Sequence, residues 1–197
     1  MDFILASGSE SRRRLLAAAG VPFAAIPADI DEDALTADLL RADTPAEDIA
    51  GRLAEAKALQ ISTRHPQALV LGADQTLLFD GAVISKCPDL VAARHLLERL
   101  RGRTHRLVGG YVLAMAGAAV WRHGETATLS VRDFSDGFLD FYLAAEGESL
   151  LSAVGCYRLE GLGAQLFARI EGDYFSILGL ALHPLLAELR RRGVLRT

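Results

Sequence analysis

Residues 68–73, with the sequence ALVLGA, form an uninterrupted run of apolar and small side chains that Asp74 follows directly. So short and so apolar a run is typical of a buried β-strand, and in α/β sheets ligands bind at the ends of such strands. A carboxylate there costs free energy unless it is paired, hydrogen-bonded or bound to a metal. The run therefore favours an α/β fold and makes Asp74 the first candidate for a catalytic residue, with a turn-capping aspartate as the structural alternative.

Strand and helix signals alternate along the rest of the chain. At Thr44-Pro45-Ala46-Glu47, a Thr cap, a Pro at the first helical position and a Glu three residues after the cap predict the start of a long helix. No internal repeat or linker is visible, so the pattern predicts one mixed α/β domain over residues 1–197. The predicted strands are 3–6, 68–73, 82–85 and 126–134, and residues 75–79 are expected to continue strand 68–73 or to pair with it. The predicted hairpins pair 105–115 with 118–121 and 165–170 with 174–178. The predicted helices are 10–19, 44–63, 88–100, 135–145 and 183–192.

Composition excludes several classes of partner. Hydrophobic residues make up 51% of the chain and charged residues 23%, which is typical of a globular protein. With 21 basic and 25 acidic residues the net charge is −4, so we expect no attraction of the whole molecule to nucleic acid or to anionic lipid. We also expect a cytoplasmic protein with no membrane segment, because no apolar stretch reaches the ~20 residues needed to span a bilayer and no signal peptide opens the chain.

The segment LASGSESRRRLL, at residues 5–16, predicts a strand, a tight loop and a helix. Three arginines in the first turns of a helix are unfavourable, because the helix N-terminus already carries about half a positive charge. Backbone N–H groups after Gly8, the hydroxyls of Ser7, Ser9 and Ser11 and at least one arginine would together bind a phosphate. The structural alternative is that Ser9 only caps the helix while the arginines are solvated.

Only two of the 21 basic residues are lysines, Lys57 and Lys86. Lys57 falls on the shoulder of the apolar stripe of its predicted helix, and Lys86 follows the short strand 82–85. Lysine in an arginine-rich chain suggests a place for a compact point charge, although chance usage also explains either residue alone. The acidic segment 29–33 is typical of a solvated loop; if one member turns inward, Glu32 with Asp74 would hold Mg²⁺.

Five motifs, in the same order, resemble those of the Maf family of nucleotide pyrophosphatases over nearly the whole chain. They are LASGSESRR at 5–13, RLAEAKA at 52–58, LGADQT at 71–76, Ser85-Lys86, and the stretch 155–182 that begins GCYRLEG and contains GDYFSILGLAL. The resemblance implies an elongated mixed sheet with flanking helices in two lobes around a central cleft, as in inosine triphosphate pyrophosphatases. It also implies a homodimer, and hydrolysis of nucleoside triphosphates, modified ones included, to the monophosphate and pyrophosphate in nucleotide metabolism.

The resemblance assigns a role to each candidate residue. It implies that Asp74 is catalytic, that Glu32 and Asp74 hold a divalent cation, Mg²⁺ or Mn²⁺, and that the substrate is bound by Ser7, Arg12, Lys57 and Lys86. Departures from the family pattern include Glu10-Ser11 in place of Pro-Arg or Pro-Trp, Cys87 in place of Pro, and Ala181 in place of Pro. None of these departures removes a proposed catalytic charge.

The family's three specificity markers fall on Ser11, Gln75 and Glu160. The dTTP/UTP branch has Arg, Thr and Gln at these positions, and the 7-methyl-GTP branch has Trp, Gln and Glu, so this chain agrees with the second branch at two of them. A Glu160 carboxylate can accept both N–H donors of a guanine edge. The aromatic ring that could stack on a methylated guanine is missing at Ser11, however, which leaves the base open at this point.

Two other functions share parts of this pattern. A non-catalytic nucleotide-binding regulator of cell division or septum formation needs the phosphate-binding residues but not the carboxylates. A phosphatase would release orthophosphate instead of pyrophosphate. Metal-dependent release of pyrophosphate distinguishes the predicted enzyme from both.

Overall fold

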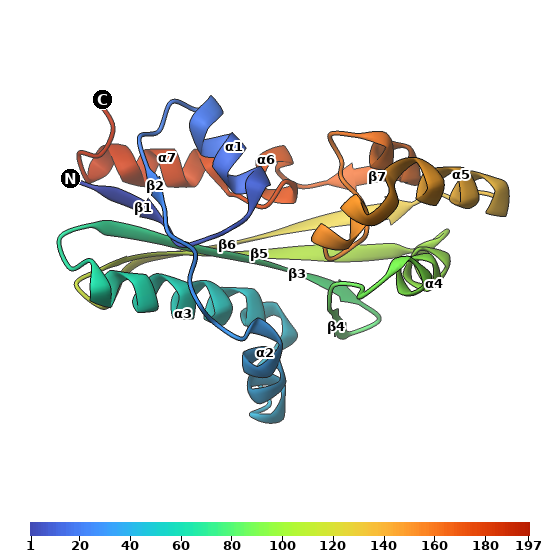
Figure 1. Ribbon diagram of the computed structural model, residues 1–197, viewed down its shortest axis with the longest axis horizontal. Helices are drawn as coiled ribbons and strands as arrows, with labels where there is room; N and C mark the ends of the chain where they lie inside the picture. Colours follow the sequence, from blue (N-terminus) through green and yellow to red (C-terminus); the bar gives the residue numbers. More distant parts are fainter. The chain divides into compact units, whose positions relative to one another are not determined.

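The computed structural model describes residues 1–197 and has the predicted mixed α/β architecture (Figure 1). Strands and helices alternate in the first half of the chain, and long antiparallel strands follow. The strands are β1 (Phe3–Leu5), β2 (Ala24–Ala25), β3 (Leu69–Phe79), β4 (Ala82–Ile84), β5 (Thr104–Met115), β6 (Ala118–Val131) and β7 (Phe167–Glu171). The helices are α1 (Glu10–Ala18), α2 (Glu32–Arg41), α3 (Ile49–Arg64), α4 (Leu90–Leu100), α5 (Asp136–Glu146), α6 (Tyr174–Ile177) and α7 (Leu182–Arg191), with 3-10 segments at Ala46–Asp48, Gly147–Ser152 and Leu162–Leu166.

All seven strands belong to one mixed sheet. Its order is β2-β1-β3-β5-β6-β7, and β4 also pairs with β3. The strand β1 is parallel to both β2 and β3, with Leu5 opposite Leu71, whereas β4 pairs antiparallel with β3 through Leu77 opposite Ile84. On the β1 side, therefore, β3 has no strand partner between Leu71 and Leu77, and Asp74 lies in this gap.

The chain folds into two compact units, which agrees with the predicted two lobes. The first contains residues 1–75, 108–125 and 173–197, and the second contains residues 76–107 and 126–172. Three of the four boundaries fall inside β3, β5 and β6, so each of these strands begins in one unit and ends in the other. The cleft that the resemblance implies, and the description of the chain as a single domain, stay predictions.

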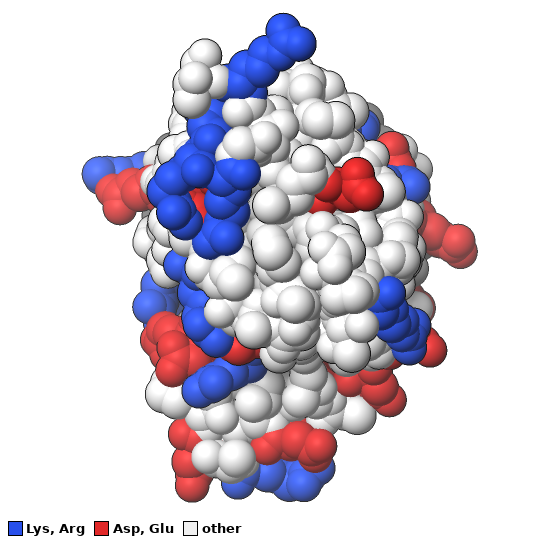
Figure 2. Space-filling model, turned by 90° about the vertical axis from the view of Figure 1, so that its left-hand side faces the viewer, with Lys and Arg blue, Asp and Glu red and all other residues white.

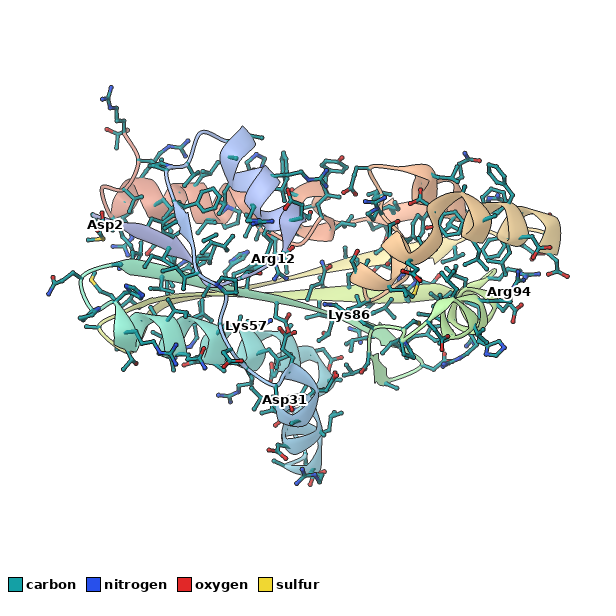
Figure 3. All side chains as sticks on the ribbon, in the orientation of Figure 1. Asp2, Arg12, Asp31, Lys57, Lys86 and Arg94 are labelled. Atoms are coloured by element: carbon teal, nitrogen blue, oxygen red, sulfur yellow. The ribbon has the colours of Figure 1, made fainter.

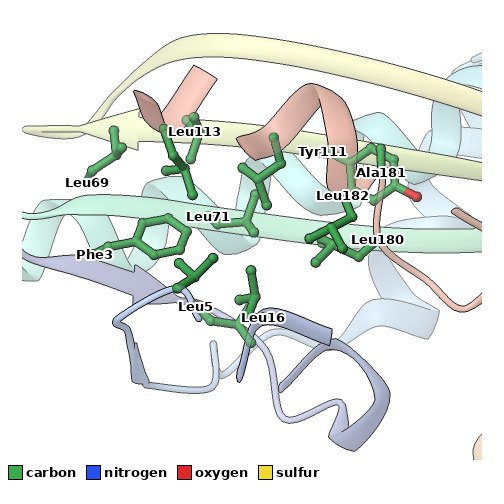
Figure 4. Packing of buried hydrophobic residues seen from close by; sticks show 14 residues of the cluster. Phe3, Leu5, Leu16, Leu69, Leu71, Tyr111, Leu113, Leu180, Ala181 and Leu182 are labelled. Atoms are coloured by element: carbon green, nitrogen blue, oxygen red, sulfur yellow. The ribbon is translucent and has the colours of Figure 1, made fainter. Parts of the chain in front are cut away.

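In the first unit, alternate residues of β1 and β3 face different helices. Phe3, Leu5, Leu69 and Leu71 belong to the core that also contains Leu16 of α1 and residues of α7 (Figure 4). Ile4 and Val70, one position along each strand, instead belong to a cluster with Ile61 of α3. The period of two in a strand thus gives both faces of the sheet a helical cover.

Two glycines let α3 approach the sheet closely. A Cβ atom on Gly72 of β3 would lie 2.0 Å from the carbonyl oxygen of Ala54, and one on Gly110 of β5 would lie 2.4 Å from the amide nitrogen of Gly51. Neither neighbour can move alone, because both are backbone atoms of α3. The glycines therefore fix the distance of α3 from β3, the two elements that carry Lys57 and Asp74.

We expect Gly72→Ala to destabilise the protein by about 2 to 3 kcal/mol, the cost of overpacking a core contact that cannot relax. Urea unfolding followed by circular dichroism measures the change. Gly51→Ala is the matched control in α3, because its Cβ would meet no atom within 4 Å and alanine favours a helix, so its free energy of unfolding should stay equal or rise. An unchanged midpoint for Gly72→Ala would show that α3 is not held by this contact.

One arginine ties the end of the C-terminal helix α7 to the sheet. On the face drawn in Figure 2, the largest group of Lys and Arg side chains surrounds an acidic side chain. Arg191 and Arg192 both donate to Glu188, and these hydrogen bonds lower the pKa of that carboxyl to about 2. Arg192 also donates to the carbonyl oxygen of Val120 in β6 at 2.9 Å, which ties the last turn of α7 to that strand.

In the second unit, a histidine is buried among aromatic rings. His105 of β5 is 2% exposed, and its Nε2 lies 2.6 Å from the hydroxyl of Tyr157, whereas its Nδ1 has no partner. Phe167 packs edge-on against Tyr157 with ring centroids 4.8 Å apart. Burial lowers the pKa of His105 to about 4, so the ring is neutral in the folded protein at neutral pH.

This histidine should make the protein less stable in mild acid. An unfolded histidine takes up a proton near pH 6.5, whereas folded His105 does so only near pH 4. The contribution of neutral His105 to the free energy of unfolding is therefore fully present above pH 6.5. It is lost as the pH falls, by up to about 3 kcal/mol at pH 4. Urea unfolding at pH 7.5, 5.5 and 4.5 should show this decline in the wild type and a weaker one in His105→Asn. His95→Asn, at an exposed position of α4, should keep the wild-type pH dependence; the same dependence in both variants would contradict the assignment.

Several element predictions are confirmed, and two are wrong. Ser9 caps α1 and Ser135 caps α5, as expected from their positions before helical runs. The acidic segment near residue 32 is not simply a loop, because Asp31 accepts from the amide of Ala34 and begins α2. The second strand of the hairpin predicted at 174–178 is the helix α6, which Asp173 caps in the same way.

Element boundaries also differ from the predictions. The residues predicted as two strands, 118–121 and 126–134, form the single strand β6. Residues 75–79 continue the strand 68–73, which is one of the two predicted arrangements, so Asp74 lies inside β3 rather than at its end. The helix predicted from Thr44 begins as a 3-10 turn at Ala46 and becomes α-helical only at Ile49, with no side-chain cap on either segment. None of the helices is long and apolar enough to cross a membrane.

Candidate active site

Lys57, Asp74 and Glu32 form a charged cluster beside β3. The Lys57 ammonium lies 3.1 Å from Oδ1 of Asp74 and 2.8 Å from Oε1 of Glu32. Lys57 and Asp74 are both buried, at 5% and 7% exposure, whereas the Glu32 side chain is about half exposed. One lysine thus bridges two carboxylates from α2 and β3, and the cluster carries a net negative charge.

Local structure explains why these three side chains meet. Asp74 and Gly72 alternate on the same face of β3, and Gly72 packs against α3. Because Gly72 has no side chain, α3 packs close to β3, and Lys57 on α3 can therefore reach Asp74. Glu32 reaches the same ammonium from the first turn of α2, so it is the member of the acidic segment that turns inward.

Ser7 and Arg12 form a second polar group at the end of β1. The Arg12 guanidinium donates from Nη1 to the Ser7 hydroxyl at 3.1 Å and from Nε to the carbonyl oxygen of Gly179 at 2.9 Å. The Ser7 oxygen also accepts from the amide of Ser9 at 3.2 Å. Arg12 is buried although it lies on the first turns of α1, so it is not one of the solvated arginines of the alternative interpretation. Ser9 does cap the helix, as the alternative interpretation expected, and the binding of a phosphate by Ser7 and Arg12 stays a prediction.

Gln75 points to the opposite face of β3 from Asp74, as expected for neighbours in a strand. Its Nε2 lies 2.8 Å from the carbonyl oxygen of Ser176 and 3.4 Å from that of Ile177. Ser11 donates its hydroxyl proton to the next carbonyl, that of Leu178, at 2.7 Å. Two of the three predicted specificity markers thus bind the same short segment at the end of α6. Figure 3 shows Arg12 and Lys57 on opposite sides of the sheet, with β3 between them.

The remaining candidates, Lys86 and Glu160, belong to the second unit. Lys86 is exposed in the segment between β4 and α4. Glu160 is exposed in the loop between the 3-10 segments Gly147–Ser152 and Leu162–Leu166. The roles that the resemblance implies for these two residues stay predictions.

The carboxylates offer a cation only oxygen ligands. No group of three or more His, Cys, Asp or Glu side chains is arranged to hold a metal ion. Asp74 and Glu32 each use one oxygen for Lys57, which leaves the second oxygen of each. Mg²⁺ is usually held by one or two carboxylates together with substrate phosphates, so this pair fits such an ion when a polyphosphate supplies the other ligands.

Comparisons with known proteins show the family of the chain. Residues 2–192 match the family of Maf-like proteins. The chain belongs to this family. It is 53% identical over 194 residues to a "Nucleoside triphosphate pyrophosphatase" of Maricaulis maris, with 98% of each chain covered. It is 47% identical over 191 residues to a "7-methyl-GTP pyrophosphatase" of Brucella abortus, with 97% of this chain and 96% of the relative covered. A "Nucleoside triphosphate pyrophosphatase" of Granulibacter bethesdensis is 50% identical over 195 residues, with 99% of each chain covered.

In this Maf-like protein, sequence reasoning missed the polar residues that hold the segment bound by the specificity markers Ser11 and Gln75. Ser176 donates its hydroxyl proton to Glu125 of β6 and lies 3.1 Å from Oδ1 of Asp173. Glu125 also lies 3.0 Å from Nε2 of His123. The motif GDYFSILGLAL had marked the region of Asp173 and Ser176, but no motif or spacing singled out Glu125.

Proposed function

We propose that the protein hydrolyses nucleoside triphosphates to the monophosphate and pyrophosphate. The observation that carries the proposal is the buried Asp74, held by Lys57 in the unpaired gap of β3 beyond the end of β1. A strand end beside such a gap is where α/β sheets bind ligands. Ser7 and Arg12 lie past the end of β1, so a polyphosphate at the gap could meet cations from both faces of the sheet.

In this proposal the chain's own residues bind the phosphates and activate water. Ser7, Arg12 and Lys57 bind phosphoryl oxygens, and the binding role that the resemblance gives Lys86 stays a prediction. Asp74 accepts a proton from a water molecule while the water oxygen bonds to the α-phosphorus. The bond from the α-phosphorus to the bridging oxygen breaks, and pyrophosphate leaves with that oxygen. Charge neutralisation at the phosphoryl oxygens supplies much of the rate in such reactions.

A divalent cation, Mg²⁺ or Mn²⁺, completes this proposal. The free carboxylate oxygens of Glu32 and Asp74 would hold it, and it would neutralise charge on the phosphate groups. The names of the relatives support hydrolysis of a nucleotide anhydride but do not mention a metal. The homodimer that the resemblance implies also stays a prediction.

The geometry of the markers favours a base that donates hydrogen bonds. The Gln75 nitrogen is used by two carbonyl oxygens, so the amide presents its oxygen to a ligand. The Ser11 proton is used by Leu178, which leaves only lone pairs. Guanine offers neighbouring N–H donors at N1 and N2, whereas uracil offers one N–H between two carbonyls. We therefore propose a guanine-type base, which is consistent with the relatives named for 7-methyl-GTP.

Phosphorus NMR on the purified protein tests the proposal. Canonical nucleoside triphosphates and 7-methyl-GTP are incubated with the protein, with and without Mg²⁺ or Mn²⁺. Pyrophosphate and monophosphate in a fixed ratio, only with metal and fastest for a guanine-type base, are the expected result. Orthophosphate as the first product would indicate a phosphatase, and tight binding without any product would favour the non-catalytic regulator.

A further inference from the structure

The end of α6 offers a row of carbonyl acceptors. The carbonyl groups in the last turn of a helix have no partner within the helix and must find others. Here the carbonyls of residues 176–179 accept from side chains, and that of Ser176 also accepts from the backbone amide of Gly179 at 2.9 Å. The side-chain donors are Gln75 of β3 and two residues of α1, Ser11 and Arg12. The position of α6 therefore sets the orientation of three side chains that belong to the proposed site.

The helix α6 cannot hold this position by itself. It has only four residues, which is far too short for a helix that is stable alone. Ser176, which is 5% exposed, connects it to the rest of the unit. Its hydroxyl donates to Glu125 of β6, and its amide bonds to the capping carboxylate of Asp173 at 2.8 Å. Of these two contacts, only the one to Glu125 reaches from α6 to the sheet.

Glu125 is itself held in one orientation. Its Oε2 accepts from Ser176, and its Oε1 lies 3.0 Å from Nε2 of His123. The His123 ring stacks on Trp121, with centroids 5.5 Å apart and planes 6° apart, and on Tyr111 at 6.2 Å. Both carboxylate oxygens are thus used within the protein. Glu125 therefore has the geometry of a support rather than of a free carboxylate.

We propose that Glu125 is a positioning residue for the nucleotide site. Through Ser176 it fixes the end of α6, whose carbonyl groups aim Arg12 at the phosphates and the Gln75 oxygen at the base. This inference rests on the proposed function. It adds a residue on β6 that touches no substrate but determines both the rate and the choice of base.

Removing this support should lower the rate strongly, because catalytic groups tolerate little displacement. A shift of about 1 Å can cost on the order of 100-fold in rate. We expect Glu125→Ala to lower kcat/KM for the preferred triphosphate by 10- to 100-fold and to reduce the preference for GTP over UTP. Glu125→Gln should recover most of this loss, because its amide oxygen can accept from Ser176 while its nitrogen donates to His123.

Coupling between Glu125 and Ser176 distinguishes positioning from a general loss of stability. Steady-state kinetics are measured for Glu125→Ala, Ser176→Ala and the double variant, at a temperature well below each unfolding midpoint. If Glu125 acts through Ser176, the double variant should be no slower than the slower single variant. Should Glu125→Ala fail to fold, Ser176→Ala carries the test alone: because it removes the same link between β6 and α6, it should show the same loss of kcat/KM and of base preference.

Glu55→Gln is the matched control. Glu55 of α3 is exposed to a similar extent as Glu125, and it also pairs with a residue of β6, because Arg122 donates from Nε to its Oε2 at 3.2 Å. That pair does not involve α6, so its loss should leave kcat/KM and the GTP-to-UTP ratio unchanged. Single effects that multiply in the double variant, or a wild-type base ratio in Glu125→Ala, would overturn the inference. A wild-type protein that hydrolyses no triphosphate would instead reject the proposed function itself.

Discussion

Replacing Asp74 with asparagine should lower kcat by about 1,000-fold or more while the protein remains folded. The amide has the size of the carboxylate and can still accept from Lys57, so the packing of β3 against α3 is kept. It cannot accept a proton from water, and it is a poor ligand for a divalent cation. Both proposed roles of Asp74 are thus removed by the replacement of one oxygen with an NH2 group, which leaves the fold intact.

Pyrophosphate release measures this loss, and circular dichroism with thermal unfolding measures the fold. Asp38→Asn is the control, because Asp38 forms an exposed ion pair with Arg41 within α2, the helix that also carries Glu32. We expect its turnover to equal that of the wild type. Turnover within tenfold of the wild type for Asp74→Asn would remove Asp74 from the reaction, whatever other residue then takes its place.

Local signals predicted the helices whose ends are fixed by nearby residues. Ser9, Asp89 and Ser135 each accept from an amide three residues later, an interaction that the sequence reveals by itself. The short apolar run FSIL was predicted as part of a strand because four residues do not distinguish the two periods. Its capping residue Asp173 was the signal for a helix. The run of α2, with Asp31 as its cap, was missed for a similar reason, since its acidic start resembled a solvated loop.

The candidate site was predictable where it depends on residue chemistry and strand parity. A buried carboxylate after an apolar run and a rare lysine on an inward shoulder were visible, and the structure joins them at 3.1 Å. The placement of Glu32 required a tertiary contact between α2 and α3, which no periodicity encodes. The same holds for Glu125, since its partner Ser176 lies 51 residues away and on an element predicted as a strand. Family motifs supplied roles for the first group and for Glu32, and they were silent on Glu125.

Replacing Lys57 with methionine should reduce both stability and turnover. The apolar stem is kept, but the ammonium that bridges Asp74 and Glu32 is lost. Asp74 is then a buried carboxylate without a cation, and breaking such a pair costs about 3 to 5 kcal/mol. The half-exposed Glu32 contributes less, because water can solvate it. We therefore expect a large decrease in the free energy of unfolding at pH 7 and, because a phosphate-binding charge is gone, a loss of turnover of at least about 100-fold.

Combining Lys57→Met with Asp74→Asn separates these two effects. If the stability loss comes from an uncompensated carboxylate, the double variant should be more stable than Lys57→Met alone, since no buried charge remains. Its turnover should nevertheless be no higher than that of Asp74→Asn. Urea unfolding gives the first quantity and pyrophosphate release the second. A double variant less stable than both single variants would mean that the charge of Asp74 is balanced by something other than this lysine.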